Sequence, residues 1–150
     1  MGDSARRARI AVINDDTDFL NLMRALLQEE ENYEVLICKE WDHAYQFVKD
    51  EQPELVIQDI RIGGEEHGWT ILNLLTLDPA TRPIPMIVCS AAIYSLHEHQ
   101  AMLSKFGIHA LPKPFDLDTL LQTIEDSLAG ARDAHGSCAR GDPCPVQRLG

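Results

Sequence analysis

The segment Arg9-Ile-Ala-Val-Ile-Asn-Asp-Asp16 joins a short, β-branched apolar run to three polar residues. Beyond it, apolar residues recur at helical spacing, which predicts an amphipathic helix. These residues are Phe19, Leu20, Met23, Leu26 and Leu27. We expect Asp16 to cap this helix, because an Asp side chain accepts hydrogen bonds from the free N–H groups of the first turn. A strand that leads directly into a helix is typical of α/β folds.

The same alternation of a short apolar run and a helical segment continues along the chain. The apolar runs at 34–38, 55–57, 86–89 and 108–111 are predicted strands, and each is followed by a predicted helix. Strands that are apolar throughout are typical of a parallel sheet that is buried on both faces. The sequence therefore predicts a doubly wound α/β fold, in which five parallel strands are flanked by five helices.

The domain is predicted to span residues 8–130. The apolar stripe of the last helix ends at Gly130, and glycine is common just after a helix. Residues 131–150 are polar and rich in glycine and proline, so we expect a flexible C-terminal tail or a truncated linker. We expect no DNA-binding or enzymatic output domain to form after residue 130.

Charge and hydropathy narrow the range of partners. The 150 residues carry a formal net charge of −11, and nucleic-acid affinity depends on Lys and Arg contacts to phosphates, so we expect no direct binding of nucleic acid. No apolar run approaches the roughly 20 residues of a membrane span. No hydrophobic stretch follows Arg6 and Arg7 to make a signal peptide. We therefore expect a cytoplasmic chain that does not bind membranes.

Polar residues with complementary charges occur where four of the predicted strands end. Asp15 follows the first strand, Asp59 the third, Ser90 the fourth and Lys113 the fifth. Ligands of such sheets bind beyond the carboxyl ends of the strands, so we expect these side chains to meet there. Carboxylates suit Mg²⁺, while a lysine and a hydroxyl can bind phosphoryl oxygens. The pattern predicts phosphoryl transfer to a carboxylate, driven by positioning and electrostatics.

Four segments together resemble the receiver domain of bacterial two-component response regulators, over about residues 8–130. They are Val12-Ile-Asn-Asp-Asp16, Pro53-Glu-Leu-Val-Ile-Gln-Asp59, Cys89-Ser-Ala91 and Leu111-Pro-Lys-Pro-Phe-Asp116. Each segment is weak evidence alone, but their common order and spacing are specific. The resemblance implies a CheY-like, flavodoxin-like sheet with the strand order 2-1-3-4-5.

The resemblance also implies roles for the polar residues. Asp59 would be the phosphoacceptor, with Lys113 and Ser90 contacting the phosphoryl group. The domain would then be a phosphorylation-controlled signalling switch rather than a conventional enzyme, and it would catalyse its own phosphoryl transfer and dephosphorylation. The implied partners are a sensor histidine kinase or phosphotransfer protein as donor and a downstream protein target, and the resemblance allows a phosphorylation-dependent homodimer.

Mg²⁺ is the implied cofactor. Its direct ligands would be Asp15, Asp59 and the backbone carbonyl of Arg61, and Asn14 would bind it through a water molecule. Relatives usually carry an acid where this chain has Asn14, which brings no negative charge, so we expect weaker Mg²⁺ binding than an acid pair would give.

Other departures leave alternatives open. Gly63 stands where relatives usually have proline, and Ala110 where an aromatic residue is common. A degenerate receiver that serves only as a non-phosphorylated protein-interaction module is therefore an alternative. A hydrolase of the haloacid dehalogenase type would need an acid where Arg61 stands. A nucleotide-binding domain would need glycines that the turn at 14–17 lacks.

Overall fold

The computed structural model describes residues 7–62, 64–91, 93–113 and 115–139, with the backbone alone for Glu30, Ile93 and 131–139. Five strands form one parallel sheet. They are β1 (Arg9–Ile13), β2 (Glu34–Cys38), β3 (Leu55–Asp59), β4 (Met86–Ser90) and β5 (His109–Pro112). The order is β2-β1-β3-β4-β5, and every neighbouring pair is parallel. This result confirms the predicted doubly wound sheet.

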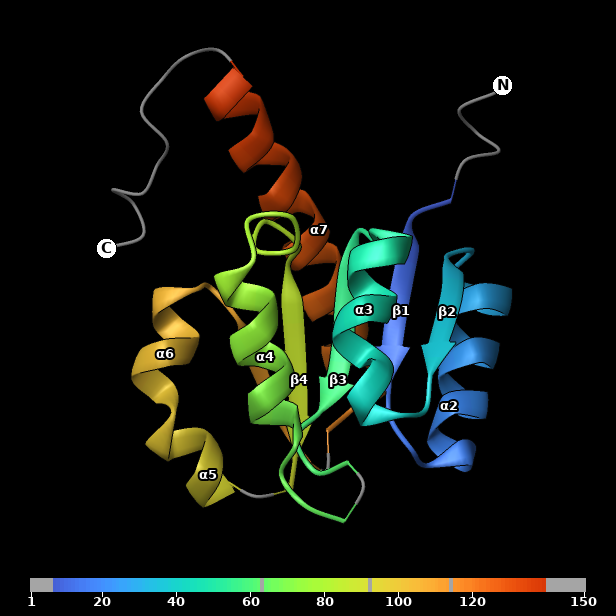
Figure 1. The fold of residues 1–150 in the computed structure, drawn as a ribbon. Coiled ribbons are helices and arrows are strands. Elements are labelled where there is room, and N and C mark those ends of the chain that lie inside the picture. The colour runs from blue at the N-terminus through green and yellow to red at the C-terminus, as the bar shows by residue number, and fades with distance from the viewer. Residues whose placement is uncertain (1–6, 63, 92, 114, 140–150) are drawn as a thin grey trace.

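Helices cover both faces of the sheet (Figure 1). They are α2 (Thr17–Met23), which continues into the π-helical η1 (Arg24–Glu30), α3 (Trp41–Glu51), α4 (Gly68–Leu77), α5 (Ile93–Glu98), α6 (Gln100–Lys105) and α7 (Leu117–Ala139). Asp16 caps α2 as predicted, because its Oδ1 accepts the N–H of Asp18 at 3.0 Å and that of Phe19 at 3.4 Å.

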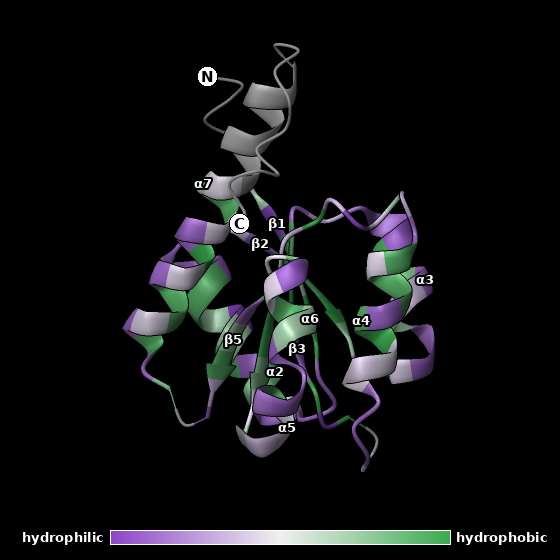
Figure 2. Ribbon diagram, turned by 90° about the vertical axis from the view of Figure 1, so that its left-hand side faces the viewer, coloured by the Kyte–Doolittle hydropathy of each residue, from purple (hydrophilic) through white to green (hydrophobic). Residues whose placement is uncertain are grey.

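Two hydrophobic clusters lie on opposite faces of the sheet. Side chains of α3, α4, α5 and α6 contribute to one cluster, together with Ala11, Val56 and Val88 of the strands. Side chains of α2, η1 and α7 contribute to the other, together with Ile10, Ile57 and Ile87. The strands are coloured largely as hydrophobic in Figure 2, whereas the helices carry both hydrophobic and hydrophilic stretches. Burial on both faces explains why the strands are apolar throughout.

Two helices differ from the predicted pattern. One helix was expected through Leu96 and Leu103, but the structure has α5 and α6, which meet at His99. The His99 N–H is shared between the carbonyls of Ser95 and Leu96 at 3.2 and 3.3 Å, which tightens the chain there. The last helix does not end at Gly130 but continues to Ala139, because an interior glycine costs a helix only about 1 kcal/mol relative to alanine.

Gly63 and residues 140–150 lie outside the described residues, so the predicted character of the C-terminal tail stays a prediction. In the part of the chain that is described, no helix combines the length and the apolar character that crossing a membrane requires.

Candidate functional site

The carboxylate of Asp59 lies at the carboxyl edge of the sheet and is surrounded by donors from three segments. Asp59 is only 7% exposed. Lys113 Nζ lies 2.5 Å from its Oδ2, and Asn14 Nδ2 donates to the same oxygen at 3.5 Å. The backbone N–H of Arg61 donates to Oδ1 at 3.0 Å. The structure therefore brings Asp59, Lys113 and Asn14 together, as the order of the strands predicts.

The turn after β1 contains one buried and one exposed candidate site residue. Asn14 is 3% exposed, and its Oδ1 accepts the N–H of Asp16 at 2.9 Å. Its amide thus connects the turn to Asp59. Asp15, the next residue, is exposed, so its carboxylate is accessible to an ion from solution.

Ser90 and Lys113 are held at the same edge by their backbones. The N–H of Lys113 donates to the carbonyl of Ser90 at 2.8 Å, which extends the pairing of β4 and β5 past the last strand residue. Ser90 is 1% exposed. Cys89, which precedes it, is buried as well, and this burial raises the pKa of its thiol to about 12. The Cys89 thiol is therefore uncharged at neutral pH.

Gly68 fixes the loop after Asp59 in a way that the sequence did not reveal. The N–H of Gly68 donates to the carbonyl of Ile60 at 2.8 Å. A Cβ at Gly68 would lie 2.5 Å from Ile60 Cα and 2.6 Å from the carbonyl oxygen of Asp59. Buried Gln58 donates from Nε2 to the Gly68 carbonyl at 3.0 Å. From the sequence, Gly68 was expected only as part of a flexible loop before the helix that includes Ile71, Leu72 and Leu75, whereas the structure has Gly68 as the first residue of α4.

Two hollows lie near the strand ends. A groove of about 450 Å³ is lined by Lys113 together with Phe19, Leu22 and Phe115. Lys113 Nζ also lies 5.4 Å from the centre of the Phe19 ring, a cation–π distance. A second hollow, of about 350 Å³, lies between α5, α6 and β5, and Ala110 lines it. The small side chain of Ala110 leaves this space open.

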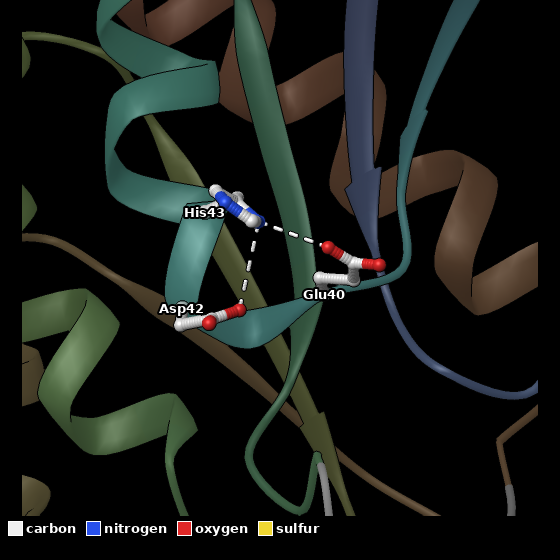
Figure 3. A group of neighbouring side chains, drawn as sticks. All are labelled: Glu40, Asp42 and His43. Atoms are coloured by element: carbon white, nitrogen blue, oxygen red, sulfur yellow. Dashed lines mark hydrogen bonds and ion pairs between the residues drawn. The ribbon is translucent and has the colours of Figure 1, made fainter.

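A second group of candidate metal ligands lies at the start of α3 (Figure 3). His43 Nδ1 lies 2.9 Å from Glu40 Oε1 and 3.6 Å from Asp42 Oδ1. All three side chains are exposed, and exposed ion pairs of this kind contribute little stability. The group includes none of the predicted site residues, and its contacts are those of a helix N-terminus with neighbouring acids.

Comparison with known proteins agrees with the fold. Residues 10–125 match the sequence model of the response regulator receiver domain. Protein PilH of Pseudomonas aeruginosa is 29% identical over 124 residues, which is 82% of this chain and 99% of that protein. Transcriptional regulatory protein ZraR of Escherichia coli (strain K12) is 31% identical over 121 residues, which is 80% of this chain but 26% of ZraR. The chain thus spans about a quarter of the length of ZraR and of the similar NtrC regulator.

Solved structures show the same fold. A CheY-like receiver domain protein from Methanospirillum hungatei superposes with a TM-score of 0.71 at 23% identity, over 85% of this chain and 98% of that one. The receiver domain of sensor histidine kinase PA1611 from Pseudomonas aeruginosa has a TM-score of 0.69 at 17% identity, over 83% of this chain and 99% of that one. That structure contains a magnesium ion in its active site cleft. Because the family's sequence model matches most of its length, the chain belongs to the response regulator receiver domain family.

Proposed function

We propose that this receiver domain is a phosphorylation-controlled signalling switch that accepts a phosphoryl group on Asp59 in a Mg²⁺-dependent reaction. The observation that carries the proposal is the contact between Lys113 Nζ and Asp59 Oδ2 at 2.5 Å. A buried carboxylate beside a single lysine can accept an anionic phosphoryl group, because the ammonium offsets the charge repulsion.

The reaction requires little covalent chemistry from the protein. A carboxylate oxygen of Asp59 attacks the phosphorus of a phosphohistidine, the P–N bond breaks, and the histidine nitrogen leaves with the electron pair. Lys113 binds a phosphoryl oxygen, and Ser90 donates a hydrogen bond to another. In dephosphorylation, water attacks the phosphorus, which restores the carboxylate and releases inorganic phosphate. Positioning of the reacting groups and electrostatic stabilisation of the transition state accelerate the reaction, as in other phosphoryl transfers.

The residues present fit a Mg²⁺ ion. Asp15 and Asp59 would offer two hard carboxylate ligands, Arg61 would offer its carbonyl, and Asn14 would bind the ion through a water molecule. Asp15 is exposed and Asp59 is nearly buried, so an ion can enter from solution and meet a carboxylate inside. The ion would neutralise phosphoryl charge opposite Lys113. Its presence in the PA1611 receiver supports the same assignment here.

The proposed partners follow from two-component signalling. A sensor histidine kinase or a phosphotransfer protein would donate the phosphoryl group, and a downstream protein would recognise the phosphorylated domain, in the cytoplasm. Phosphorylation-dependent homodimer formation would require the phosphorylated surface to be self-complementary. The acidic charge of −11 disfavours direct binding of nucleic acid by this chain.

The rival function is that of a degenerate receiver, which would bind proteins without being phosphorylated. Asn14 and Ala110 are the residues that favour it. The close approach of Lys113 to Asp59 favours the switch instead, because an interaction module has no need of a buried acid and a lysine at this edge.

Intact mass spectrometry after incubation with Mg²⁺ and acetyl phosphate tests the proposal. We expect the wild type to gain one phosphoryl group, and Asp59→Asn or added EDTA to prevent the gain. Asp18→Asn is a matched control, because it removes an exposed acid from the first turn of α2 and should leave the reaction intact. A folded wild type that gains no phosphoryl group would support the degenerate module.

A further inference from the structure

A hydroxyl on α5 connects two segments that both lead away from the proposed phosphorylation site. Ser95 Oγ donates to Glu66 Oε1 at 2.9 Å and accepts the indole N–H of Trp69 at 2.9 Å. Glu66 lies in the loop after Asp59, and Trp69 lies in the first turn of α4. Figure 1 shows α5 beside the end of α4 where this loop arrives.

The junction of α5 and α6 belongs to the same unit. The His99 ring stacks on Trp69, with 3.7 Å between ring centres and an angle of 12° between the planes. His99 Nδ1 lies 2.9 Å from the carbonyl oxygen of Ser95, and since a carbonyl only accepts, Nδ1 is the donor. Trp69 and Ser95 are both buried, at 8% and 9% exposure. We refer to Glu66, Trp69, Ser95 and His99 as the Ser95 bridge.

The loop end of the Ser95 bridge is held rigidly against Asp59. Gly68 donates its N–H to Ile60 at 2.8 Å, and the backbones touch so closely that no side chain fits between them. On the other side of the bridge, the chain runs from Ser90, at the end of β4, into α5. The Ser95 bridge therefore links the segment that follows Asp59 to the segment that follows Ser90.

We propose that Ser95 is a positioning residue that couples the state of Asp59 to the α5–α6 segment of this chain. The proposal rests on the function proposed above. Phosphorylation adds charge and three acceptor oxygens at Asp59, whose Oδ1 now accepts the N–H of Arg61 at 3.0 Å. The loop carrying Arg61 must adjust to the new oxygens. Because Gly68 packs tightly against Ile60, the loop cannot move without displacing Glu66 and Trp69. Both residues are hydrogen-bonded to Ser95 of α5, so the displacement should extend to that helix.

Trp69 supplies the readout, because its indole N–H bond and its ring stack are the contacts that should change. The chain has two tryptophans, and the other, Trp41, stacks on His67 with 3.8 Å between ring centres. Trp41→Phe retains a ring for that stack and leaves Trp69 as the single tryptophan, which is excited selectively at wavelengths that tyrosine does not absorb. In this background, emission is recorded before and after Mg²⁺ and acetyl phosphate are added, and intact mass records phosphorylation in the same samples.

The parent should show an emission change with phosphorylation, and Ser95→Ala should be phosphorylated but lose that change. Ser104→Ala removes an exposed hydroxyl from α6 and should behave as the parent does. Glu66→Gln retains an acceptor for Ser95 and should keep the change, whereas Glu66→Ala should lose it.

A phosphorylated Ser95→Ala protein with the parent's full emission change would overturn the coupling role while leaving the proposed function intact. A phosphorylated parent with no emission change would do the same. A folded parent that gains no phosphoryl mass would overturn the proposed function, and the coupling role with it.

Discussion

Lys113 Nζ lies 2.5 Å from Asp59 Oδ2, although the two residues are 54 positions apart in the chain. The Asp59 side chain is 10% exposed and that of Lys113 is 31% exposed. A carboxylate this buried requires a cation or several donors nearby. Without a metal, Lys113 is the counter-ion of Asp59, and a bound Mg²⁺ ion would share that role.

Replacing Lys113 with methionine should therefore destabilise the metal-free protein. We expect Lys113→Met to lower the free energy of unfolding in EDTA by about 1–2 kcal/mol, less than for a fully buried pair because the lysine is partly exposed. Mg²⁺ should restore more stability to this variant than to the wild type. Lys105→Met, on the exposed end of α6, is the control for urea unfolding. Equal losses for the two variants would contradict the proposed counter-ion role.

A carboxylate in place of Asn14 should strengthen the proposed metal site. Asn14 Nδ2 lies 3.5 Å from Asp59 Oδ2, so Asn14→Asp would bring two carboxylates together. We expect lower stability in EDTA, because like charges repel, and roughly tenfold tighter Mg²⁺ binding, because the divalent ion gains a nearby charge.

Thermal unfolding across a Mg²⁺ titration measures both effects of Asn14→Asp, since a ligand of the folded state stabilises it. Asn21→Asp adds the same charge to an exposed position of α2 and controls for net charge. If both variants bind Mg²⁺ as the wild type does, the assignment of Asn14 to the metal site is wrong.

The loop after Asp59 should tolerate no side chain at Gly68. A Cβ there would lie 2.5 Å from Ile60 Cα, so Gly68→Ala should lower the free energy of unfolding by about 1–3 kcal/mol, as overpacking does. Gly130→Ala is the matched control: no atom lies within 4 Å of its Cβ position, and alanine favours a helix by about 1 kcal/mol. The midpoint of chemical denaturation should therefore fall for Gly68→Ala and rise for Gly130→Ala. A Gly68→Ala variant as stable as the wild type would contradict the close contact.

Much of this architecture was predictable because it depends on local patterns. Apolar strands predicted the parallel sheet, and the sheet predicted that Asp59 and Lys113 would meet at its edge. The Ser95 bridge was not predictable, because Trp69 and Ser95 are 26 positions apart and nothing local links them. The break at His99 was missed for the same reason, since it depends on a tertiary stack with Trp69. Gly130 misled the prediction of the last helix because a glycine can also lie inside a helix.

Acid should weaken the contact between α3 and the segment after α4. Asp78 accepts hydrogen bonds from the Tyr45 hydroxyl and from the Ala80 N–H, and these bonds, with Lys49, lower the pKa of Asp78 to about 2. A lowered pKa stabilises the folded protein above the unfolded value near 4, and this stability is lost as the pH falls toward 2.

The difference in stability between the wild type and Asp78→Asn should therefore be largest near neutral pH and should shrink between pH 4 and about 2. Tyr45→Phe, which removes the strongest contribution to the shift, should flatten this pH dependence. Urea unfolding at a series of pH values measures both. A difference that does not change with pH would show that the Asp78 carboxylate has an ordinary pKa.

Reductive trapping tests most directly whether Asp59 carries the phosphoryl group. Sodium borohydride reduces an aspartyl phosphate to homoserine, and peptide sequencing by mass spectrometry then identifies the modified position. After incubation with Mg²⁺ and acetyl phosphate, we predict homoserine at position 59 alone. Homoserine at Asp15 or Asp16 instead, or at no position in a folded protein, would contradict the assignment.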